Sequence, residues 1–554
     1  MAENSDALQE VFQKSIGKKN KGAVSAVIFD NEKILRYFFD GFIDREKKTA
    51  LQADSLFMIG SNTKVFTSLG IFRLLEDGKL KLEDPVTDYV PEFSVKSRIG
   101  EYPVTIENLL MHRGGIQCDL YEFFAGDKKY SDVVEELKKT FRTSIPGEMF
   151  AYSNLGYALL GVIEERISGK PYVEFLKEVL FDPLGMEVYY APEKDLPGQV
   201  LDRVALSYDK RGKRQQDLAG EVHPAGSCTY TTAESLARVG MLLMNDGVYK
   251  DTRLYKEETI RLMKSLKVND ELDETLACVG YGLFHHALAL DYETGRILGH
   301  GGDTLYHHSF FEFLEEEKIG VIVLTNFEAG ALLSREVGAA LFNAYLKEAG
   351  FTEKAKKEEK YVSFDPKEYV GRYDAMPEPI EFKVDAKGRL CVTLNKIPFV
   401  LKKDEEGWLC GEPTPLWCKL PPIGKKMKGI RFLQTSYFGH DVLVTEQKGV
   451  KAVMGERYVT PNVNTAWLKA MGDYVCKDKR YKNLFEKASL LLKEGEPVLS
   501  IFQEGHRIDC YLDIINETEA IVKGFGRNTK QTLTLINSEG SYSINTDGTV
   551  LNKK

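Results

Sequence analysis

The first part of the chain alternates between the hydrophobic patterns of strands and of helices. Segments Gly22–Phe29 and Ile34–Phe42 predict two strands joined by a turn at residues 30–33. Ile319–Leu324 is a short and almost continuous apolar run, which is typical of a strand buried on both faces. These segments predict a mainly antiparallel sheet.

Two longer segments have apolar residues at helical spacing. Val65–Leu75 predicts a helix that ends at Asp77-Gly78, and Leu155–Ile167 predicts one that stops at Gly169. We therefore expect an α/β domain over residues 1–352, with helices on both sides of its sheet.

A charged segment separates this part from the rest of the chain. Residues 353–360 read Glu-Lys-Ala-Lys-Lys-Glu-Glu-Lys, and Asp365-Pro366 follows shortly after. We interpret residues 353–364 as a linker, and the alternative is the exposed end of the preceding helix.

The remainder is rich in short alternating runs separated by turn residues. Ile508, Cys510, Leu512 and Ile514 alternate as a half-buried strand does. Residues 369–373 (Tyr-Val-Gly-Arg-Tyr) resemble residues 470–474 (Ala-Met-Gly-Asp-Tyr) about a hundred residues later. This repeat predicts two antiparallel β-barrel-like domains, 365–460 and 461–554, although one larger barrel stays an alternative.

Composition narrows the class of protein. Hydrophobic residues make up 43% of the chain and charged residues 28%, which is typical of a folded globular protein. The net charge of −9 does not suggest nucleic-acid binding. No apolar run approaches the roughly 20 residues of a membrane span, so we expect no membrane partner. The N-terminus lacks a secretory signal, and the eight cysteines form no CxxC pair, so we expect a cytoplasmic protein with reduced thiols.

Ser61-Asn62-Thr63-Lys64 is the first candidate for chemistry. At the start of a helix, Ser61 and Lys64 share one face, with Cβ atoms roughly 5–6 Å apart. A lysine acts as a base only if its surroundings lower its pKa, and the flanking residues are apolar. The same spacing occurs at Ser15–Lys18 and Ser207–Lys210, but no amphipathic helix follows either of those pairs.

Two further motifs could complete a site. Tyr152 offers a phenol that relays a proton, and Asn154 can hold a substrate amide, although a lone tyrosine is also common in cores. In His300-Gly301-Gly302 the glycines permit close approach of a substrate, and His300 can carry a hydrogen bond beside the nucleophile. His112-Arg113-Gly114 has the same spacing.

Metal and nucleotide chemistry find no support in the sequence. The adjacent pairs His285-His286 and His307-His308 point to opposite faces of a strand, which does not chelate a metal. No glycine-rich phosphate loop precedes a helix. We expect no metal and no cofactor.

Taken in order, the three motifs resemble the serine β-lactamase and penicillin-binding superfamily, in its class C-like branch with esterases and D-aminopeptidases. Seven segments between about residues 10 and 345 carry the resemblance: 58–64, 78–86, 105–112, 146–157, 224–227, 299–302 and 321–326. The resemblance implies the α/β catalytic fold of this family, an antiparallel sheet flanked by helices. The β-rich tail is more weakly similar to the lipocalin-like domains that follow this fold in D-aminopeptidases.

The resemblance also implies roles for particular residues. Ser61 would be the nucleophile that forms an acyl-enzyme, and Lys64 and Tyr152 the proton-transfer pair. Asn154 would contact the substrate amide. The third motif follows Tyr-x-Asn in this family, which selects His300 over His112 and places Gly302 and Asp303 at the substrate. The backbone N–H groups of Ser61 and Asp303 would form the oxyanion hole.

The sequence departs from the family at the third motif. β-Lactamases have Lys-Thr-Gly where this chain has His-Gly-Gly, and Asp303 replaces a further glycine. The lysine version favours a substrate carboxylate, so antibiotic hydrolysis is disfavoured as the main activity. An unpaired Asp303 carboxylate would favour a substrate ammonium group, whereas the alternative is that Asp303 caps the following turn.

The leading hypothesis is a serine amidase or peptidase acting on short peptides, including D-configured ones. The alternatives are a carboxylesterase of the same fold and a non-catalytic penicillin-binding or sensor protein. The partner is then a small peptide, amide or ester, and the sequence leaves a homo-oligomer open.

Overall fold

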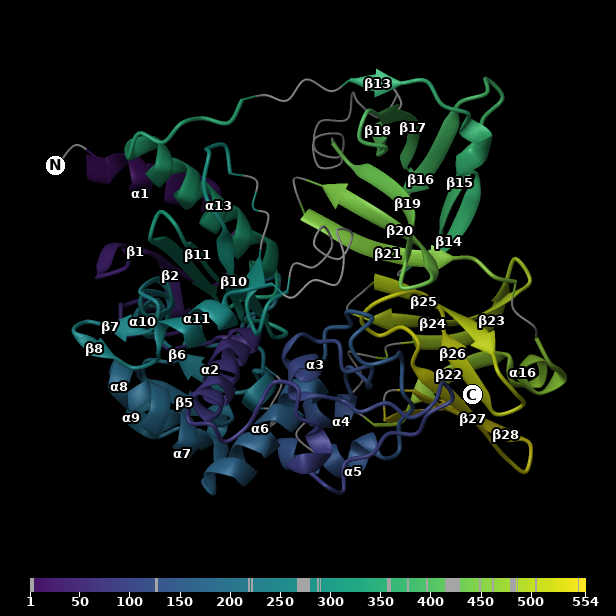
Figure 1. The fold of residues 1–554 in the computed structure, drawn as a ribbon, viewed down its shortest axis with the longest axis horizontal. Coiled ribbons are helices and arrows are strands. Elements are labelled where there is room, and N and C mark those ends of the chain that lie inside the picture. The colour runs from purple at the N-terminus through teal and green to yellow at the C-terminus, as the bar shows by residue number, and fades with distance from the viewer. Residues whose placement is uncertain are drawn as a thin grey trace.

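The computed structural model describes most of the chain. It covers residues 4–554 apart from 125–127, 218–219, 221–222, 267–278, 286–287, 289, 356–359, 376–377, 395–396, 414–428, 448–449, 461–462, 479–484, 486, 504–505 and 547. Three bodies are visible: an α/β part formed by the first two thirds of the chain, and two β-rich parts beside it (Figure 1).

The α/β part is built on one seven-stranded sheet in which every pairing is antiparallel. In spatial order its strands are β3 (Thr49–Ala50), β2 (Ile34–Asp44), β1 (Ala23–Asp30), β12 (Ile319–Thr325), β11 (His308–Leu314), β10 (Ile297–Asp303) and β9 (Phe284–His285). The predicted hairpin is thus confirmed as β1 and β2. The apolar run at 319–324 is also confirmed as a strand, and all seven residues of β12 are buried.

Helices cover both faces of this sheet, as the sequence predicts. α1 (Asn4–Ile16) and α13 (Gly330–Glu348) pack against one face, and α10 (Ala233–Met244) and α2 (Thr63–Glu76) lie on the other. Val321 and Val323 of β12 are buried in the hydrophobic core on the α1 and α13 face, whereas Ile322 and Leu324 are buried in the core on the α10 and α2 face. Because neighbouring side chains of a strand point to opposite faces, a doubly covered strand is apolar throughout.

The other predicted helix is α6 (Asn154–Ser168), which ends at Gly169 with a φ of +70°. Ser153 caps its first turn by accepting a hydrogen bond from the Gly156 N–H. Shorter elements complete this part: β4 (Phe57–Met58), α3 (Ile106–Leu110), α4 (Tyr121–Phe124), α5 (Val133–Leu137), α7 (Tyr172–Leu176), α8 (Asp182–Leu184), β5 (Val188–Tyr190), α9 (Gly198–Leu201), β6 (Thr229–Thr231), β7 (Val248–Tyr249), β8 (Thr252–Arg253) and α11 (Glu257–Met263).

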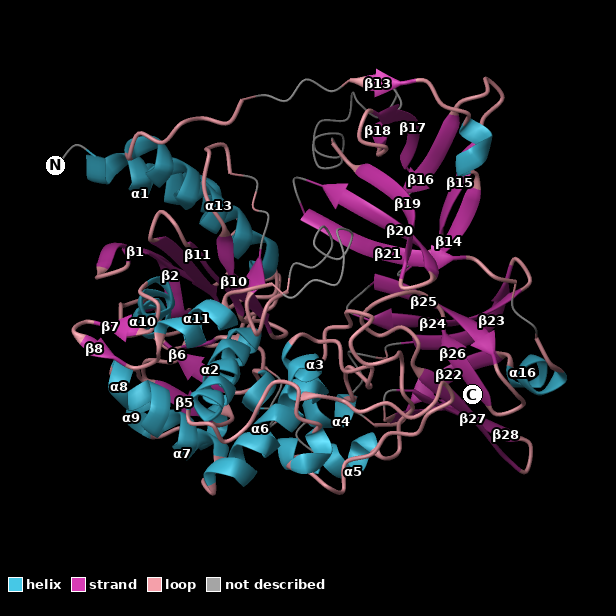
Figure 2. Ribbon diagram, in the orientation of Figure 1, coloured by secondary structure: helices cyan, strands magenta, loops and turns pink. Residues whose placement is uncertain are grey.

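The tail forms two closed eight-stranded antiparallel barrels, coloured as strands at the right of Figure 2. The first contains β14 (Gly371–Ala375), β15 (Ile380–Val384), β16 (Leu390–Leu394), β17 (Ile397–Asp404), β18 (Leu409–Pro413), β19 (Arg431–Tyr437), β20 (His440–Gln447) and β21 (Val450–Arg457), and β13 (Tyr361–Val362) adds to β17. The second follows α16 (Thr465–Ala470) and contains β22 (Gly472–Cys476), β23 (Lys487–Lys493), β24 (Glu496–Gln503), β25 (His506–Ile514), β26 (Glu519–Val522), β27 (Thr532–Ser538), β28 (Ser541–Thr546) and β29 (Thr549–Lys553).

The sequence repeat marks equivalent positions in the two barrels. Each copy lies where a short helix leads into the first strand, and Tyr373 and Tyr474 are buried in the respective cores. The half-buried strand predicted at 508–514 is β25, but Asp509 and Tyr511 on its other face are buried as well. The apolar face predicted for this strand is confirmed, because Cys510, Leu512 and Ile514 are buried in the core of the second barrel. The exposure expected for its other face holds for Asp513 but not for Asp509 and Tyr511. The first barrel lies close to that face, since the guanidinium of Arg372 lies 5.3 Å from the ring centroid of Tyr511.

The charged segment begins beyond the last helix of the α/β part. α13 ends at Glu348, so the alternative that residues 353–360 extend this helix is wrong. Residues 352–354 instead pair with 291–293, and 356–359 lie outside the described residues. The division into 1–352, 353–364, 365–460 and 461–554 stays a prediction.

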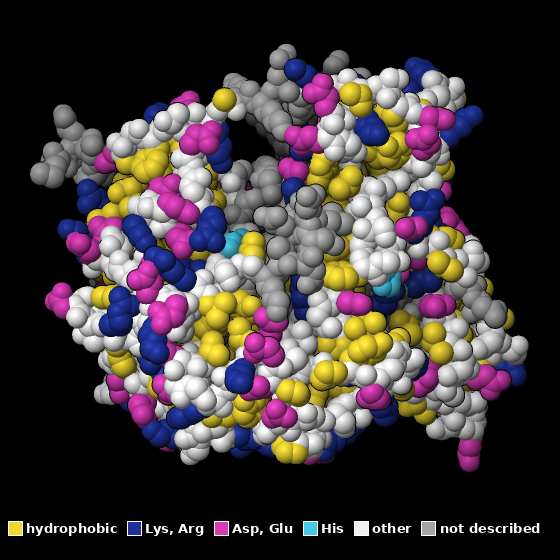
Figure 3. All heavy atoms as spheres, in the orientation of Figure 1, with side chains coloured by type: hydrophobic (Ala, Val, Ile, Leu, Met, Phe, Trp, Pro, Cys, Tyr) yellow, Lys and Arg dark blue, Asp and Glu magenta, His cyan; other side chains and the backbone are white. Residues whose placement is uncertain are grey.

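The second barrel lies beside helices α3 to α5 of the α/β part, and the first barrel lies against the second (Figure 1). Arg98 pairs with Glu519 at 3.0 Å across the first of these contacts. On the face shown in Figure 3, basic and acidic side chains are interspersed. Within the described part of the chain, no helix combines the length and apolar character required to cross a lipid bilayer.

Candidate active site

Ser61 lies in a tight turn directly before α2. A single 3₁₀ turn, Gly60–Asn62, leads into the helix, and Gly60 has a φ of +52°. A side chain at Gly60 would place its Cβ 2.8 Å from the backbone N of Asp303, so the turn packs directly on the end of β10. Only glycine fits this close approach, which brings the Ser61 turn and the Asp303 backbone together.

Lys64 is on the same face of the helix start, as its spacing from Ser61 predicts. Its side chain is fully buried, and its Nζ lies 3.1 Å from Ser61 Oγ. Nζ also donates to Asn154 Oδ1 at 2.6 Å and to the Ala225 carbonyl at 2.5 Å. Burial, and secondly the positive charge of Arg527, hold the pKa of Lys64 well below its usual value.

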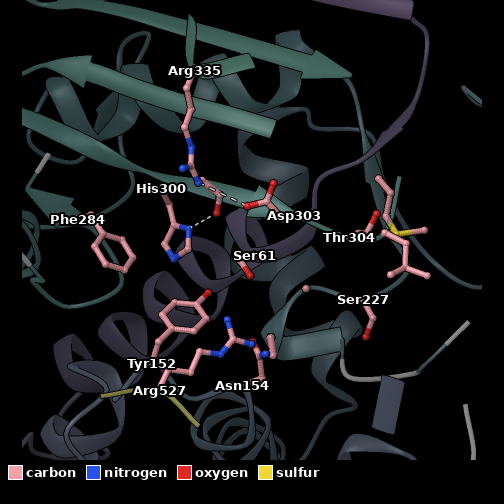
Figure 4. Close-up of a pocket in the computed structure, with 15 residues that line it drawn as sticks. Ser61, Tyr152, Asn154, Ser227, Phe284, His300, Asp303, Thr304, Arg335 and Arg527 are labelled. Atoms are coloured by element: carbon pink, nitrogen blue, oxygen red, sulfur yellow. Dashed lines mark hydrogen bonds and ion pairs between the residues drawn. The ribbon is translucent and has the colours of Figure 1, made fainter. Parts of the chain in front are cut away.

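In Figure 4 Tyr152 lies below Ser61, and its hydroxyl points toward Ser61. This hydroxyl is buried and has no well-formed hydrogen bond to a described residue. Burial raises the pKa of Tyr152 above its usual value, although the Ser61 hydroxyl and the charge of Arg527 oppose that shift. The Lys64 Nζ lies 4.7 Å from the centroid of the Tyr152 ring.

His112 supports Tyr152 from behind and is not part of the third motif. Its ring lies 4.3 Å from that of Tyr152, centroid to centroid, and its Nδ1 accepts a hydrogen bond from the Ser153 N–H at 3.0 Å. Burial lowers the pKa of His112 well below its usual value, which keeps the ring neutral.

Asn154 is the first residue of α6 and links Lys64 to a buried carboxylate. Its Nδ2 donates to Asp119 Oδ1 at 2.6 Å, while its Oδ1 accepts from Lys64. Asp119 Oδ2 in turn accepts from Arg527, which belongs to the loop between β26 and β27 of the second barrel. The site therefore contains a residue from the C-terminal end of the chain.

The third motif lies on β10, opposite Tyr152. His300 and Gly301 line the cavity, and the rings of His300 and Tyr152 are 6.1 Å apart. Gly302 is not among the described residues that line the cavity, and its assignment as a substrate-binding residue stays a prediction. A Cβ there would lie 1.9 Å from the Ile59 carbonyl, and the glycine instead lets β10 pack on the nucleophile turn.

Asp303 lines the cavity, but its carboxylate is paired. His308 Nδ1 lies 2.7 Å from Oδ1, and Arg335 Nη2 lies 3.6 Å from Oδ2. Although burial alone would raise it, these two partners hold the pKa of Asp303 below its usual value. The unpaired carboxylate considered from the sequence is therefore not present, and no hydrogen bond from the Asp303 side chain to the following turn is described either.

The two residues of the pair His307-His308 have different partners. His307 Nδ1 accepts from the Met58 N–H at 3.2 Å, whereas His308 faces Asp303. His286 lies outside the described residues.

These side chains surround one cavity of about 450 Å³ (Figure 4). Its described lining residues are Met58, Ser61, Tyr152, Asn154, Ala225, Gly226, Ser227, Phe284, His300, Gly301, Asp303, Thr304, Leu305, Arg335 and Arg527. A volume of this size holds a small-molecule or short-peptide ligand. The competing pairs Ser15–Lys18 and Ser207–Lys210 do not line it, and Ser15 Oγ bonds within α1 to the Val11 carbonyl.

Several residues of the site carry no local sequence signal. Asp119, Phe284, Arg335 and Arg527 lie outside the three motifs. Only the fold brings Phe284, Arg335 and Arg527 to the cavity and Asp119 to Asn154. The spacing of His112-Arg113-Gly114 identifies His112 only as a copy of the third motif. Its position in segment 105–112, which carries the family resemblance, was the one available signal.

Comparison with known proteins shows the family of the α/β part. The sequence model of the family described as Beta-lactamase matches residues 8–343. Penicillin-binding protein 4* of Bacillus subtilis (strain 168) is 28% identical over 344 residues, which span 58% of this chain and 71% of that protein.

Two solved structures show the same fold. The octameric penicillin-binding protein homologue from Pyrococcus abyssi aligns over 99% of this chain and all of its own, with a TM-score of 0.51 and 18% identity. The D-amino acid amidase from Ochrobactrum anthropi SV3, complexed with L-phenylalanine amide, aligns over 63% of this chain and all of its own, with a TM-score of 0.51 and 22% identity.

Proposed function

This chain belongs to the beta-lactamase family of serine hydrolases, and from that premise we propose that it is an amidase or peptidase that acts on short peptides, including D-configured ones. In this proposal Ser61 forms an acyl-enzyme, Lys64 and Tyr152 transfer the protons, and Asn154 contacts the substrate amide. The observation that carries the proposal is the burial of Lys64 together with the hydrogen bonds that its Nζ makes.

A neutral lysine in these surroundings is arranged to accept the Ser61 proton. A neutral amine has two N–H donors and one lone pair. The Ala225 carbonyl and Asn154 Oδ1 are acceptors only, and they occupy both donors. The lone pair is left for the Ser61 hydroxyl, 3.1 Å away. Since burial lowers the pKa of Lys64, its neutral form is reached at a lower pH than that of a lysine in water.

The opposite shift of Tyr152 supports a different role for it. Burial raises its pKa, so the phenol keeps its proton in the free enzyme. Ser61 Oγ then bonds to the substrate carbonyl carbon while its proton passes to Lys64. When the carbon–nitrogen bond breaks, Tyr152 donates a proton to the leaving amine and regains one from Lys64. Water then attacks the acyl-enzyme, the same groups transfer the protons in the reverse direction, and the carboxylic acid leaves with Ser61 restored.

The negative charge that develops on the carbonyl oxygen requires donors in place beforehand. The backbone N–H groups of Ser61 and Asp303 are proposed for this role. This assignment is supported by the close contact between the turn that carries Ser61 and strand β10, where a side chain at Gly60 or Gly302 would not fit. A side chain at Gly226 would also meet the Gly60 carbonyl at 2.3 Å, so three glycines permit the arrangement.

The choice of an amide rather than a β-lactam rests on the third motif and on a relative. His300 stands where β-lactamases place a lysine that favours a substrate carboxylate. The Ochrobactrum anthropi enzyme of the same fold is named for its action on D-amino acid amides. The octameric state of the Pyrococcus abyssi homologue supports a homo-oligomer, which sedimentation velocity would test.

An activity panel tests the proposal. Matched D- and L-aminoacyl p-nitroanilides, the p-nitrophenyl esters of the same acyl groups, and nitrocefin are each incubated with the full chain. We expect anilide turnover that Ser61→Ala abolishes. Turnover of the esters alone would contradict the amidase assignment and favour a carboxylesterase. No turnover and no serine labelling would favour a non-catalytic binder.

A further inference from the structure

The loop between β26 and β27 joins all three parts of the molecule. Its Phe525 is buried in one cluster with Cys118 and Met149 of the α/β part and with Tyr437 of the first barrel. Lys523, which precedes it, lies 3.3 Å from Asp374 of the first barrel. The loop of the second barrel is therefore fixed against both of its neighbours.

The backbone of this loop has a defined shape. Gly524, Gly526, Asn528 and Lys530 all have positive φ, at +113°, +101°, +62° and +58°. Lysine adopts this region at an energetic disadvantage, and the Lys530 side chain pairs with Glu456 of the first barrel. The result is a compact turn that presents Arg527 to the catalytic cavity.

Arg527 reaches the centre of the site. It lines the cavity with Ser61 and Tyr152, and its guanidinium carbon lies 5.1 Å from the centroid of the Tyr152 ring. Its Nε and Nη2 both bond to Asp119 Oδ2, at 2.9 and 2.8 Å. Figure 4 shows its guanidinium between Tyr152 and Asn154.

These contacts continue as an unbroken chain to the nucleophile. Asp119 Oδ1 accepts from Asn154 Nδ2, Asn154 Oδ1 accepts from Lys64, and Lys64 Nζ lies 3.1 Å from Ser61 Oγ. Since a carboxylate only accepts, Asp119 determines which end of the Asn154 amide faces Lys64. Arg527 is the cation that balances this buried carboxylate.

We propose that Arg527 of the second barrel is a positioning residue of the active site: through Asp119 it holds the orientation of Asn154 and so the base Lys64. The inference rests on the proposed function of Lys64 as the base for Ser61. The second barrel is then part of the catalytic machinery, although it lies after the catalytic fold in the sequence.

The electrostatics of Lys64 support this role. After burial, the charge of Arg527 is the main influence that lowers the pKa of Lys64, and Asp119 opposes it. Removing Arg527 leaves Asp119 unbalanced, which favours the protonated lysine. The groups that face Lys64 from the elements packed around it are Ser61, His112, Asp119, Tyr152, Asn154, Tyr157, Ala225, His300 and Arg527.

Three variants of the full chain test the proposal: Arg527→Met, Arg527→Lys and the control Arg98→Met. Arg98 also joins the α/β part to the second barrel, through Glu519, but lies outside the catalytic cavity. The measurement is the second-order rate of labelling by a fluorophosphonate as a function of pH, with kcat/KM for an aminoacyl anilide alongside.

We expect Arg527→Met to reduce the labelling rate at neutral pH by about 10- to 100-fold, the scale of a displaced catalytic group, and to move the acid limb of the profile to higher pH. Arg527→Lys keeps the charge but not the two-point contact, so its acid limb should stay near that of the wild type at a reduced rate. Arg98→Met should match the wild type in both respects.

The outcomes separate the inference from the function on which it rests. If the wild type labels and Arg527→Met matches Arg98→Met in rate and acid limb, the positioning role is wrong and the proposed function stands. If Arg527→Met loses rate but keeps its acid limb, while Arg527→Lys matches the wild type, Arg527 contacts the reagent directly and the inference is overturned. If the wild type does not label, both are overturned.

Discussion

The protonation state of Lys64 can be tested through stability alone, by the substitution Lys64→Met. Methionine is apolar and of similar length, so it removes the titrating group from a fully buried position. In the unfolded chain a lysine stays protonated up to a pKa of about 10.4. In the folded protein burial lowers the pKa of Lys64, so folding releases a proton between these two pKa values.

The size of the effect follows from this one proton. The unfolded wild type binds more protons than the folded one, so its free energy of unfolding rises with pH by about 1.4 kcal/mol per pH unit relative to Lys64→Met. From about pH 7 to about pH 9 the relative gain is about 2.7 kcal/mol if the folded lysine is neutral throughout. The variant leaves Asn154 Oδ1 and the Ala225 carbonyl without a donor, which costs about 1–3 kcal/mol each but does not depend on pH.

Equilibrium urea unfolding of both proteins at several pH values measures this slope. Far-ultraviolet ellipticity is the suitable signal because the helices lie mainly in the α/β part, whereas Trp408 and Trp467 are in the barrels. Lys18→Met, at an exposed position, controls for the loss of one positive charge. If the free energies of unfolding of the wild type and Lys64→Met change with pH in parallel, Lys64 stays charged in the folded protein, and its assignment as a neutral base is wrong.

Three further substitutions test other parts of the account. Tyr152→Phe should reduce kcat/KM by about 10²–10⁴, and because Tyr152 and Lys64 transfer one proton in sequence, Tyr152→Phe/Lys64→Arg should be far from additive. Glu164 is fully buried with neither carboxylate oxygen in a well-formed hydrogen bond to a described group, and burial raises its pKa well above the usual value. The wild type therefore loses stability as pH rises, so Glu164→Gln should have the higher Tm at about pH 8, by a margin that shrinks toward about pH 5. Since Asp303 is paired with His308 and Arg335, Asp303→Asn should leave the preference between an aminoacyl anilide and its N-acetylated form unchanged, and a lost preference would restore the charge-selection hypothesis.

The sequence predicts the parts of the molecule that depend on local pattern. The hairpin of β1 and β2, the helices α2 and α6, and the doubly buried strand β12 each have a periodicity that burial on one or two faces requires. The proximity of Ser61 and Lys64 is local in the same sense, because residues three apart on a helix share a face.

Contacts between distant segments could not be predicted in this way. Asp119 and Arg527 are 408 residues apart, and nothing near either residue indicates that docking of the second barrel joins them. The outer face of β25 is polar by pattern, yet Asp509 is buried there. Asp303 follows a motif whose sequence is informative, but its charge partners come from β11 and α13. The first two cases depend on how separately folded parts pack, and the third depends on how elements pack within the α/β part.

The central claim is that Ser61 is the nucleophile of this site. The most direct test is to treat the full chain with a fluorophosphonate and to locate the adduct by intact mass and peptide mapping. We predict one adduct per chain, on Ser61, and none on Ser61→Ala. This variant should stay folded because alanine fits the 3₁₀ turn and the substitution removes no helix-capping hydrogen bond. An adduct on another residue, or equal labelling of folded Ser61→Ala, would contradict the account.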